Sequence, residues 1–180
     1  MAEAPTADLL AAAHNGSQDA WNSLVDRYGR LVWSVVRGFR LDAATAADVS
    51  QTVWLRLVEH SDRIRDPERL GSWLATTARN ESIRMLKRLS RSVPTEFSLD
   101  IADEGAPGID ERLLDDEQLR EVLVVFEDIS PRCRELLQML CLDPPLEYEE
   151  ISEILGMAIG SIGPTRARCL DRIRKRLERR

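Results

Sequence analysis

The stretch EYEEISEILGMAIGSIGPTRARCLDRIRKRLERR at residues 147–180 predicts two helices joined by a tight turn. Apolar residues line one face of the first helix at helical spacing: Ile151, Ile154 and Leu155. Gly156 follows where a helix ends, because glycine tolerates a positive φ without steric cost. We expect Ser161 to cap the second helix and Pro164 to lie in its first turn. This pattern is typical of a helix-turn-helix, whose second helix enters the major groove of DNA.

The second of these helices is strongly basic. Residues 166–180 carry eight Lys or Arg against Asp171 and Glu178, a local net charge of +6, whereas the whole chain has a net charge of −6. An ordinary exposed terminal helix is the alternative, but such helices usually mix their charges. The concentration of positive charge favours binding to nucleic acid.

Composition indicates a soluble helical protein. The chain has 180 residues, 43% of them hydrophobic and 31% charged. Gly and Pro cluster in two places instead of recurring at strand–turn intervals, which argues against an all-β fold. The N-terminus lacks the features of a signal peptide, and no apolar stretch approaches the roughly 20 residues that span a bilayer. We therefore expect a cytoplasmic protein without membrane insertion.

The sequence offers little to an enzyme or to a metal site. Cys133, Cys141 and Cys169 form no CxxC pair, and His14 and His60 have no ligand-like neighbours at metal spacing. We expect the three cysteines to be small buried apolar residues and not a disulfide or metal framework. Ser-His-Asp, P-loop and GxGxxG motifs are missing. No catalytic residue, metal or cofactor is therefore predicted.

Charge divides the chain into three parts. Residues 1–90, 91–128 and 129–180 have net charges of +1, −9 and +2. The acidic part starts with SVPTEFSLDIADEGAPGIDE (92–111), which has too little apolar periodicity for a core of its own. We therefore predict an all-α protein of two small helical domains, residues 1–90 and 113–180, joined by a flexible acidic linker, residues 91–112. The second domain contains the helix-turn-helix, preceded by helices over about 113–128 and from Pro131, which Ser130 caps.

In the first domain, apolar periodicity predicts helices over about 6–14, 19–39, 43–60 and 67–90. Their short connections favour a compact bundle. The residues expected in the core are Trp21, Leu24, Val25, Tyr28, Leu31, Val32, Val35, Val36, Val49, Val53, Leu57, Val58, Leu70, Leu74, Ala78 and Ile83.

Two polar stripes on these helices suggest binding surfaces. On the fourth helix, the stripe contains Trp73, Thr77, Asn80, Arg84, Lys87 and Arg91. An aromatic ring, hydrogen-bonding groups and cations in line suit single-stranded nucleic acid, although Trp73 in the core beside a solvated face is the simpler alternative. On the third helix, Asp48, Gln51 and Leu55 share a stripe. Trp54 either enters the core or stands beside this stripe as part of a protein interface.

In this order the blocks resemble a bacterial RNA polymerase sigma factor of the compact extracytoplasmic-function (group IV) type. The motifs that carry the resemblance are DAWNSLVDRYGRLVWSV (19–35), AADVSQTVWLRLVEH (46–60), RLGSWLATTARNESIRMLKR (69–88), SPRCRELLQML (130–140) and residues 147–177. The resemblance covers nearly the whole chain. It implies a transcription initiation factor that binds core RNA polymerase, recognises −10 and −35 promoter elements and aids promoter melting.

The resemblance also implies roles for individual residues. The third helix resembles the part that binds the β′ clamp helices, so Asp48, Gln51, Trp54 and Leu55 become candidate polymerase contacts. The fourth helix and the loop before it resemble the part that melts and reads the −10 element, where the loop holds a flipped base. The candidate contacts there are Arg63, Arg65, Trp73, Thr77, Asn80, Arg84 and Lys87.

The C-terminal domain resembles the −35 reader, which also contacts the β flap. Its candidate DNA contacts are Ser161, Pro164, Thr165, Arg168 and Arg172, while Ile162, Cys169, Ile173 and Leu177 would face the core. The sequence departs from the commoner family pattern GTVKSRLHRAR at Gly163, Pro164 and Thr165, so the −35 preference of relatives does not transfer. The linker resembles the segment that threads toward the polymerase active centre. The resemblance also implies that the chain binds an anti-sigma factor and that it is a monomer when free.

Two other functions are compatible with parts of the sequence. A stand-alone helix-turn-helix regulator needs only the last 50 or so residues and leaves the stripe of Asp48 and Gln51 without a role. A pure interaction protein, or an enzyme that uses a cysteine, is the third hypothesis, with Cys133 as its candidate nucleophile.

Overall fold

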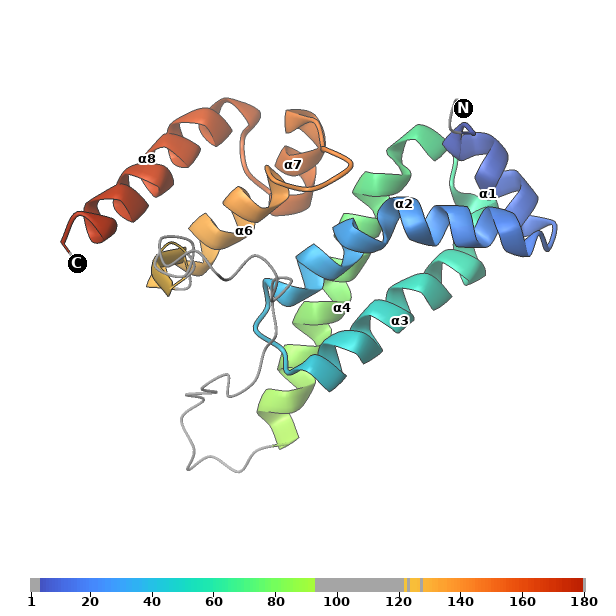
Figure 1. Ribbon diagram of the computed structural model, residues 1–180, viewed down its shortest axis with the longest axis horizontal. Coiled ribbons are helices and arrows are strands. Elements are labelled where there is room, and N and C mark those ends of the chain that lie inside the picture. The colour runs from blue at the N-terminus through green and yellow to red at the C-terminus, as the bar shows by residue number, and fades with distance from the viewer. Residues whose placement is uncertain (1–3, 93–121, 123, 127, 180) are drawn as a thin grey trace. The chain divides into compact units, whose positions relative to one another are not determined.

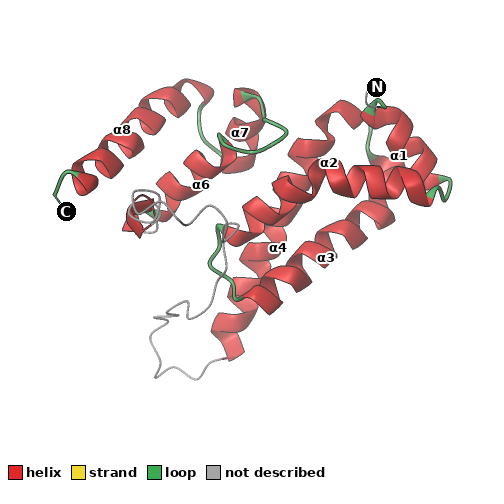
Figure 2. Ribbon diagram, in the orientation of Figure 1, coloured by secondary structure: helices red, strands yellow, loops and turns green. Residues whose placement is uncertain are grey.

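The computed structural model describes residues 4–92, 122, 124–126 and 128–179. Every regular element in these ranges is a helix, and no strand occurs there (Figures 1 and 2). The all-α prediction is thus confirmed. The helices form two compact units. Within the same ranges, none of the helices combines the length and the apolar character needed to cross a membrane.

The first unit contains the four helices α1 (Thr6–His14), α2 (Gln18–Arg37), α3 (Ala43–His60) and α4 (Leu70–Ser92). Two 3-10 turns, η1 (Ser61–Arg63) and η2 (Pro67–Arg69), connect α3 to α4. Side-chain caps start two of the helices. Ser17 Oγ accepts a hydrogen bond from the Ala20 amide at 3.3 Å, and Asp42 Oδ1 accepts one from the Thr45 amide at 3.0 Å. Because α2 packs against α1, α3 and α4, it forms the centre of the bundle.

The core of this unit follows the apolar stripes of α2, α3 and α4. Its largest fully buried side chains are Leu24, Leu31, Val32, Val35, Val36, Leu57, Leu70 and Leu74. The core prediction was wrong for two residues, because Val25 is 42% exposed and Val58 is 53% exposed. Each follows a fully buried leucine, and consecutive helical residues point about 100° apart. Trp21 and Ile83 are half-buried at the edge of the core.

The connection to α4 differs from the prediction. Pro67 begins the 3-10 turn η2, and α4 starts three residues later at Leu70. The helix then continues to Ser92, so the first two residues of the predicted linker are helical. The remainder of that linker lies outside the described residues, as does most of the helix expected over 113–128. The described residues 122, 124–126 and 128 at its end are helical.

The second unit contains α6 (Pro131–Met139), α7 (Tyr148–Leu155) and α8 (Ile159–Leu177), which pack against one another. As predicted, Ser130 caps α6 and Pro131 is its first residue, with Ser130 Oγ accepting from the Cys133 amide at 3.4 Å. Glu147 and Glu150 form a capping box at the start of α7 that the sequence analysis missed. There the Glu147 amide donates to Glu150 Oε2 at 2.9 Å.

The turn of the helix-turn-helix confirms one expectation and corrects another. Gly156 ends α7 in the left-handed conformation, with φ 58° and ψ 45°. The second helix, however, starts two residues before the predicted cap, since Ala158 is the N-cap of α8. Ser161 lies inside the helix, where its hydroxyl donates to the Ala158 carbonyl at 2.6 Å. Pro164 is also inside the helix and not in its first turn.

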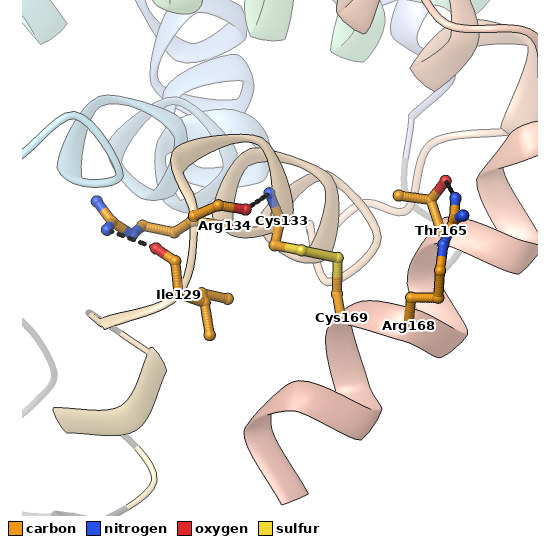
Figure 3. The surroundings of a disulfide bond; sticks show 7 residues. Ile129, Cys133, Arg134, Thr165, Arg168 and Cys169 are labelled. Atoms are coloured by element: carbon orange, nitrogen blue, oxygen red, sulfur yellow. Dashed lines mark hydrogen bonds between the residues drawn. A yellow bond between two sulfur atoms is a disulfide. The ribbon is translucent and has the colours of Figure 1, made fainter. Parts of the chain in front are cut away.

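The prediction for the cysteines is wrong in two respects, the disulfide and the exposure of Cys141. Cys133 on α6 and Cys169 on α8 are buried, as expected, but they form a disulfide across 36 residues of sequence (Figure 3). Cys141 is a free thiol and is exposed. The pairing depends on how α6 packs against α8, which the spacing of cysteines in the sequence does not reveal.

Candidate nucleic-acid interface

A pocket of about 400 Å³ is formed by one face of α4 and the last turns of α3. Its lining residues are Arg56 and His60 from α3 and Trp73, Thr77, Asn80, Glu81 and Arg84 from α4. The volume lies within the roughly 300–1,000 Å³ of small-molecule sites, which is enough for a nucleobase with its sugar. Four residues of the predicted −10 stripe thus come together in one concave site.

The polar groups of the pocket are partly committed within the protein. The Thr77 hydroxyl donates to the Trp73 carbonyl at 2.8 Å, so it has only lone pairs left for a ligand. Asn80 is exposed and has an amide that both donates and accepts, which makes it the better group for a base edge. Trp73 is half-buried, so its ring forms a wall of the pocket while part of it stays accessible.

Glu81 controls the positive charge of the pocket. Its Oε1 lies 2.8 Å from Arg84 Nη1 and 3.6 Å from Arg56 Nε, while Arg56 Nη1 also lies 3.0 Å from Glu59 Oε2. The Glu81 side chain is 15% exposed and that of Arg84 is 69% exposed. Since only the Arg84 end of this ion pair is largely exposed, a phosphate can reach Arg84 but must compete with Glu81 for it.

Sequence reasoning missed three of the lining residues: Arg56, His60 and Glu81. A signal existed for Glu81, which is four residues after Thr77 and therefore on the same helical face. The α3 residues join the pocket only through the packing of α3 on α4. Buried Nδ1 of His60 has no hydrogen-bond partner among the described residues. Other predicted −10 contacts do not line the pocket: Lys87, Arg63 and Arg65 are exposed on α4 and on the connection before it.

The outer face of α3 brings the four predicted polymerase contacts to the surface. Asp48, Gln51 and Leu55 are exposed, and the leucine is 62% exposed. Trp54 is half-buried and packs edge-to-face on Trp21 of α2, with ring centroids 6.5 Å apart. Trp54 is thus neither fully in the core nor fully exposed, and its part in a protein interface stays a prediction.

On α8 the predicted −35 contacts lie on the side away from the core. Pro164, Arg168 and Arg172 are exposed, whereas Ser161 and Thr165 are half-buried. Arg168 Nη2 donates to Thr165 Oγ1 at 3.0 Å, which orients the guanidinium along the helix (Figure 3). The buried side contains Ile162 and Cys169, with Ile173 packed beside them. The division of the helix into two faces is as predicted.

The last turns of α8 hold a separate ion-pair cluster. Asp171 accepts from Lys175 at 2.8 Å and from Arg174 at 2.6 Å. These hydrogen bonds, the one from Lys175 first, lower the pKa of the Asp171 carboxyl below its ordinary value. Arg168 and Arg172 are not part of this cluster, so they keep their charge for another partner.

Comparisons with known proteins agree with this organisation. Residues 24–92 match the family model "Sigma-70 region 2", and no curated protein sequence matches the chain significantly. The solved structure of CnrH in complex with the cytosolic domain of CnrY is similar with a TM-score of 0.66 at 20% identity, covering 98% of each chain. The sigma factor RpoE from Bartonella quintana, in complex with the anti-sigma factor NepR, gives 0.68 at 22% identity over 90% of this chain and 98% of the other.

The two structural likenesses establish a shared fold over nearly the whole length of the chain. The sequence match covers most of α2 and all of α3 and α4, which contain the pocket and the outer face of α3, and it assigns this segment to sigma-70 region 2. The chain therefore contains a sigma-70 region 2 segment within a fold that it shares with CnrH and with the sigma factor RpoE.

Proposed function

We propose that this chain is a sigma factor of the extracytoplasmic-function type that binds core RNA polymerase through α3, holds the −10 strand in the α3–α4 pocket and reads the −35 element with α8. Sigma factors are transcription initiation factors and not enzymes, so the work is done by binding energy alone. The observation that carries the proposal is the pocket, which gathers an aromatic wall, an amide and two arginines in the region 2 domain.

A single base extruded from the DNA stack fits the chemistry of this pocket. Extrusion costs a few kcal/mol, and stacking on an aromatic ring returns about 1–3 kcal/mol per base. Trp73 supplies the ring, Asn80 the hydrogen bonds and Arg84 the phosphate contact. Arg63 and Arg65 precede the pocket in sequence, and Lys87 follows it, so we propose that they hold the backbone on either side. Because only the opened strand gains these contacts, binding shifts the promoter toward the melted state.

Polymerase binding is assigned to the outer face of α3. Gln51 offers a polar group one turn before Leu55 and Asp48 another two turns before it, and Trp54 broadens the apolar centre. Aromatic and apolar residues surrounded by polar ones are the usual composition of an interface core and its rim. We extend the predicted surface by Val58, which is exposed one turn beyond Trp54. The β′ clamp helices are the proposed occupant.

The −35 contact is assigned to the exposed side of α8. Arg168 and Arg172 are one turn apart and can reach phosphates or guanine edges in a major groove. Pro164 and Thr165 lie one turn earlier, and the half-buried Ser161 comes before them. We also propose the β flap as the polymerase contact of this unit. Since RpoE was solved with the anti-sigma factor NepR, we further propose that this chain has an anti-sigma partner.

Run-off transcription tests the whole proposal. Purified chain is added to core polymerase on a fragmented bacterial genome, and the 5′ ends of the transcripts are sequenced to find its promoters. We expect a common pair of upstream elements. With these promoters, Asp48→Ala should weaken binding to core polymerase, whereas Arg168→Ala should keep that binding and lose about 1–3 kcal/mol of promoter binding if it reads a base edge. Failure of the chain to bind core or to start any transcript would refute the proposal.

The stand-alone regulator makes a different prediction in the same experiment. It requires tight and specific binding to duplex DNA without polymerase, and no effect of Asp48→Ala. A helix-turn-helix of α7 and α8 is compatible with that function, but the pocket and the outer face of α3 would then have no use. Specific duplex binding by the free chain together with inactive transcription would favour this alternative.

A further inference from the structure

The disulfide joins the two helices that decide how the −35 reading face is presented. Cys133 is on α6, which supports the helix-turn-helix, and Cys169 is in the middle of α8, the proposed reading helix (Figure 3). The bond closes a segment of 36 residues that contains the whole of α7 and the turn. Such a cross-link restricts the unfolded chain and stabilises the closed arrangement.

Cys169 is close to the DNA-facing side chains along the helix. Arg168 immediately precedes it, and Thr165, to which the Arg168 guanidinium donates, is one turn earlier (Figure 3). The cysteine points into the core with 1% exposure while Arg168 is exposed. A shift of α8 on α6 therefore moves Arg168 and Thr165 directly.

In the part of the chain that the structure describes, an apolar cluster surrounds the disulfide where α8 packs on α6. The buried cluster around the bond contains Ile129, Cys133, Leu137 and Cys169, with Phe126 and Ile173 packed against it. At the far end, Arg176 Nη1 donates to the Asp128 carbonyl at 2.7 Å, but this contact is exposed and contributes little. Because the covalent bond lies inside this cluster, we expect it to add rigidity to the packing of α8 on α6.

The reduced form is compatible with the same fold. A free cysteine behaves as a small apolar residue, and both thiols would remain in an apolar cluster. Reduction would therefore loosen α8 without exposing a charge or leaving a cavity. These are the properties of a reversible switch and not of a bond needed for folding.

We propose that Cys133 and Cys169 form a dithiol–disulfide site through which cellular thiols regulate −35 binding. The inference rests on the proposed function, because polymerase and promoter DNA occur where thiols are kept reduced, and disulfides there are usually transient and redox-sensing. In the oxidised form, the disulfide fixes the orientation of α8 before it binds the major groove. In the reduced form, α8 becomes ordered only during binding, which costs free energy.

The exchange is balanced with a low-molecular-weight thiol as reductant. A thiolate attacks Sγ of Cys133, which is the more exposed of the two cysteines at 5%, after local opening of the cluster. The S–S bond breaks, a mixed disulfide forms on Cys133, and Cys169 leaves as a thiolate that takes up a proton. A second thiolate attacks the reductant's sulfur in the mixed disulfide and releases Cys133 as a thiolate that takes up a proton. Two external thiols thereby lose two electrons and become one external disulfide, while the protein disulfide becomes two thiols. Oxidation by an external disulfide reverses these steps.

The test compares the full chain in oxidised glutathione and in dithiothreitol. Thiol alkylation in denaturant should count one reactive cysteine, Cys141, in the first and three in the second. A duplex is selected from a random pool with the oxidised protein bound to core polymerase, and the Kd of that complex for the duplex is then measured in both states. We expect reduction to weaken binding threefold or more and to raise amide exchange in α8, with no change in α2 to α4.

Two variants serve as controls. The double variant Cys133→Ala/Cys169→Ala should bind the selected duplex as the reduced protein does and should ignore dithiothreitol. Cys141→Ser should keep the full redox response. Three reactive thiols in the oxidising buffer, or a Kd that is equal in both states, would overturn the proposal. If neither state selects a duplex, the proposed −35 reading has failed, and unchanged exchange in α8 upon reduction would then overturn the redox site as well.

Discussion

Replacing Trp73 by alanine should weaken single-strand binding more than any other single change in the pocket. Among the lining residues that the structure describes, Trp73 has the largest aromatic ring, and His60 is the other aromatic residue. Base–aromatic stacking contributes about 1–3 kcal/mol, which corresponds to a loss of affinity of about 5- to 150-fold. Trp73→Phe keeps a smaller aromatic face and should fall between the wild type and the alanine variant.

The assay measures binding of a fluorescent single strand, carrying the −10 sequence found by transcript mapping, to the complex of sigma factor and core polymerase. Trp33→Ala is the matched control, because Trp33 is 40% exposed on α2, outside the pocket, with the Arg37 guanidinium 5.9 Å from its ring centroid. Thermal unfolding of each variant shows whether it is folded at the assay temperature. A folded Trp73→Ala protein that binds the strand as tightly as Trp33→Ala would refute the stacking role.

Three further predictions concern charge and stability in the first unit. Glu81→Gln removes a negative charge about 7 Å from a bound phosphate, and the repulsion between two such charges in water is about 0.6 kcal/mol. Single-strand affinity should therefore rise about two- to threefold in a low-salt titration, and an unchanged affinity would contradict the role given to Glu81. Tyr28→Phe removes a buried 3.0 Å hydrogen bond to Thr6 Oγ1, so the free energy of unfolding should fall by about 1 kcal/mol and the Tm by roughly 4–8 °C in calorimetry. An unchanged Tm would mean that the hydrogen bond makes no net contribution to stability. Hydrogen bonds from Thr45, the side-chain one first, lower the pKa of the Asp42 carboxyl below 3.8. The stabilising effect of the charged Asp42 is therefore present above pH 3.8 and is lost as the pH falls through the lowered pKa. The Tm difference between wild type and Asp42→Ala should shrink over that range, and a constant difference would exclude a charged cap.

The sequence predicted the first unit well because its signals are local. The bounds of α1 and α3 match the expected ranges, since Asn15-Gly16-Ser17 and Asp42 interrupt and restart the helices by their own chemistry. The start of α8 was wrong because the Ser161 hydroxyl bonds back to the Ala158 carbonyl instead of capping. A serine in a turn has both options, and periodicity does not distinguish them.

Features that depend on packing between helices escaped the prediction. The stripe on α4 follows from helical spacing alone, but Arg56 and His60 enter the pocket only because α3 packs on α4. The disulfide likewise requires α6 and α8 to meet across 36 residues. Half-buried Trp54 is a third case, because its partner Trp21 is on a different helix. Sequence periodicity assigns a residue to a face, and tertiary structure decides what that face meets.

The two proposed DNA sites differ in how their positive charge is held, and this suggests an order of events. Arg168 and Arg172 are exposed and outside the ion-pair cluster of Asp171, so α8 is ready to contact duplex phosphates through counterion release. In the pocket, by contrast, a phosphate must first displace Glu81 from Arg84. That competition penalises weak, non-specific phosphate contacts and leaves a net gain only when a base also stacks on Trp73. The proposed −35 contact should therefore form first and the −10 contact only with an opened strand, which agrees with a factor that must not hold double-stranded DNA in its melting site.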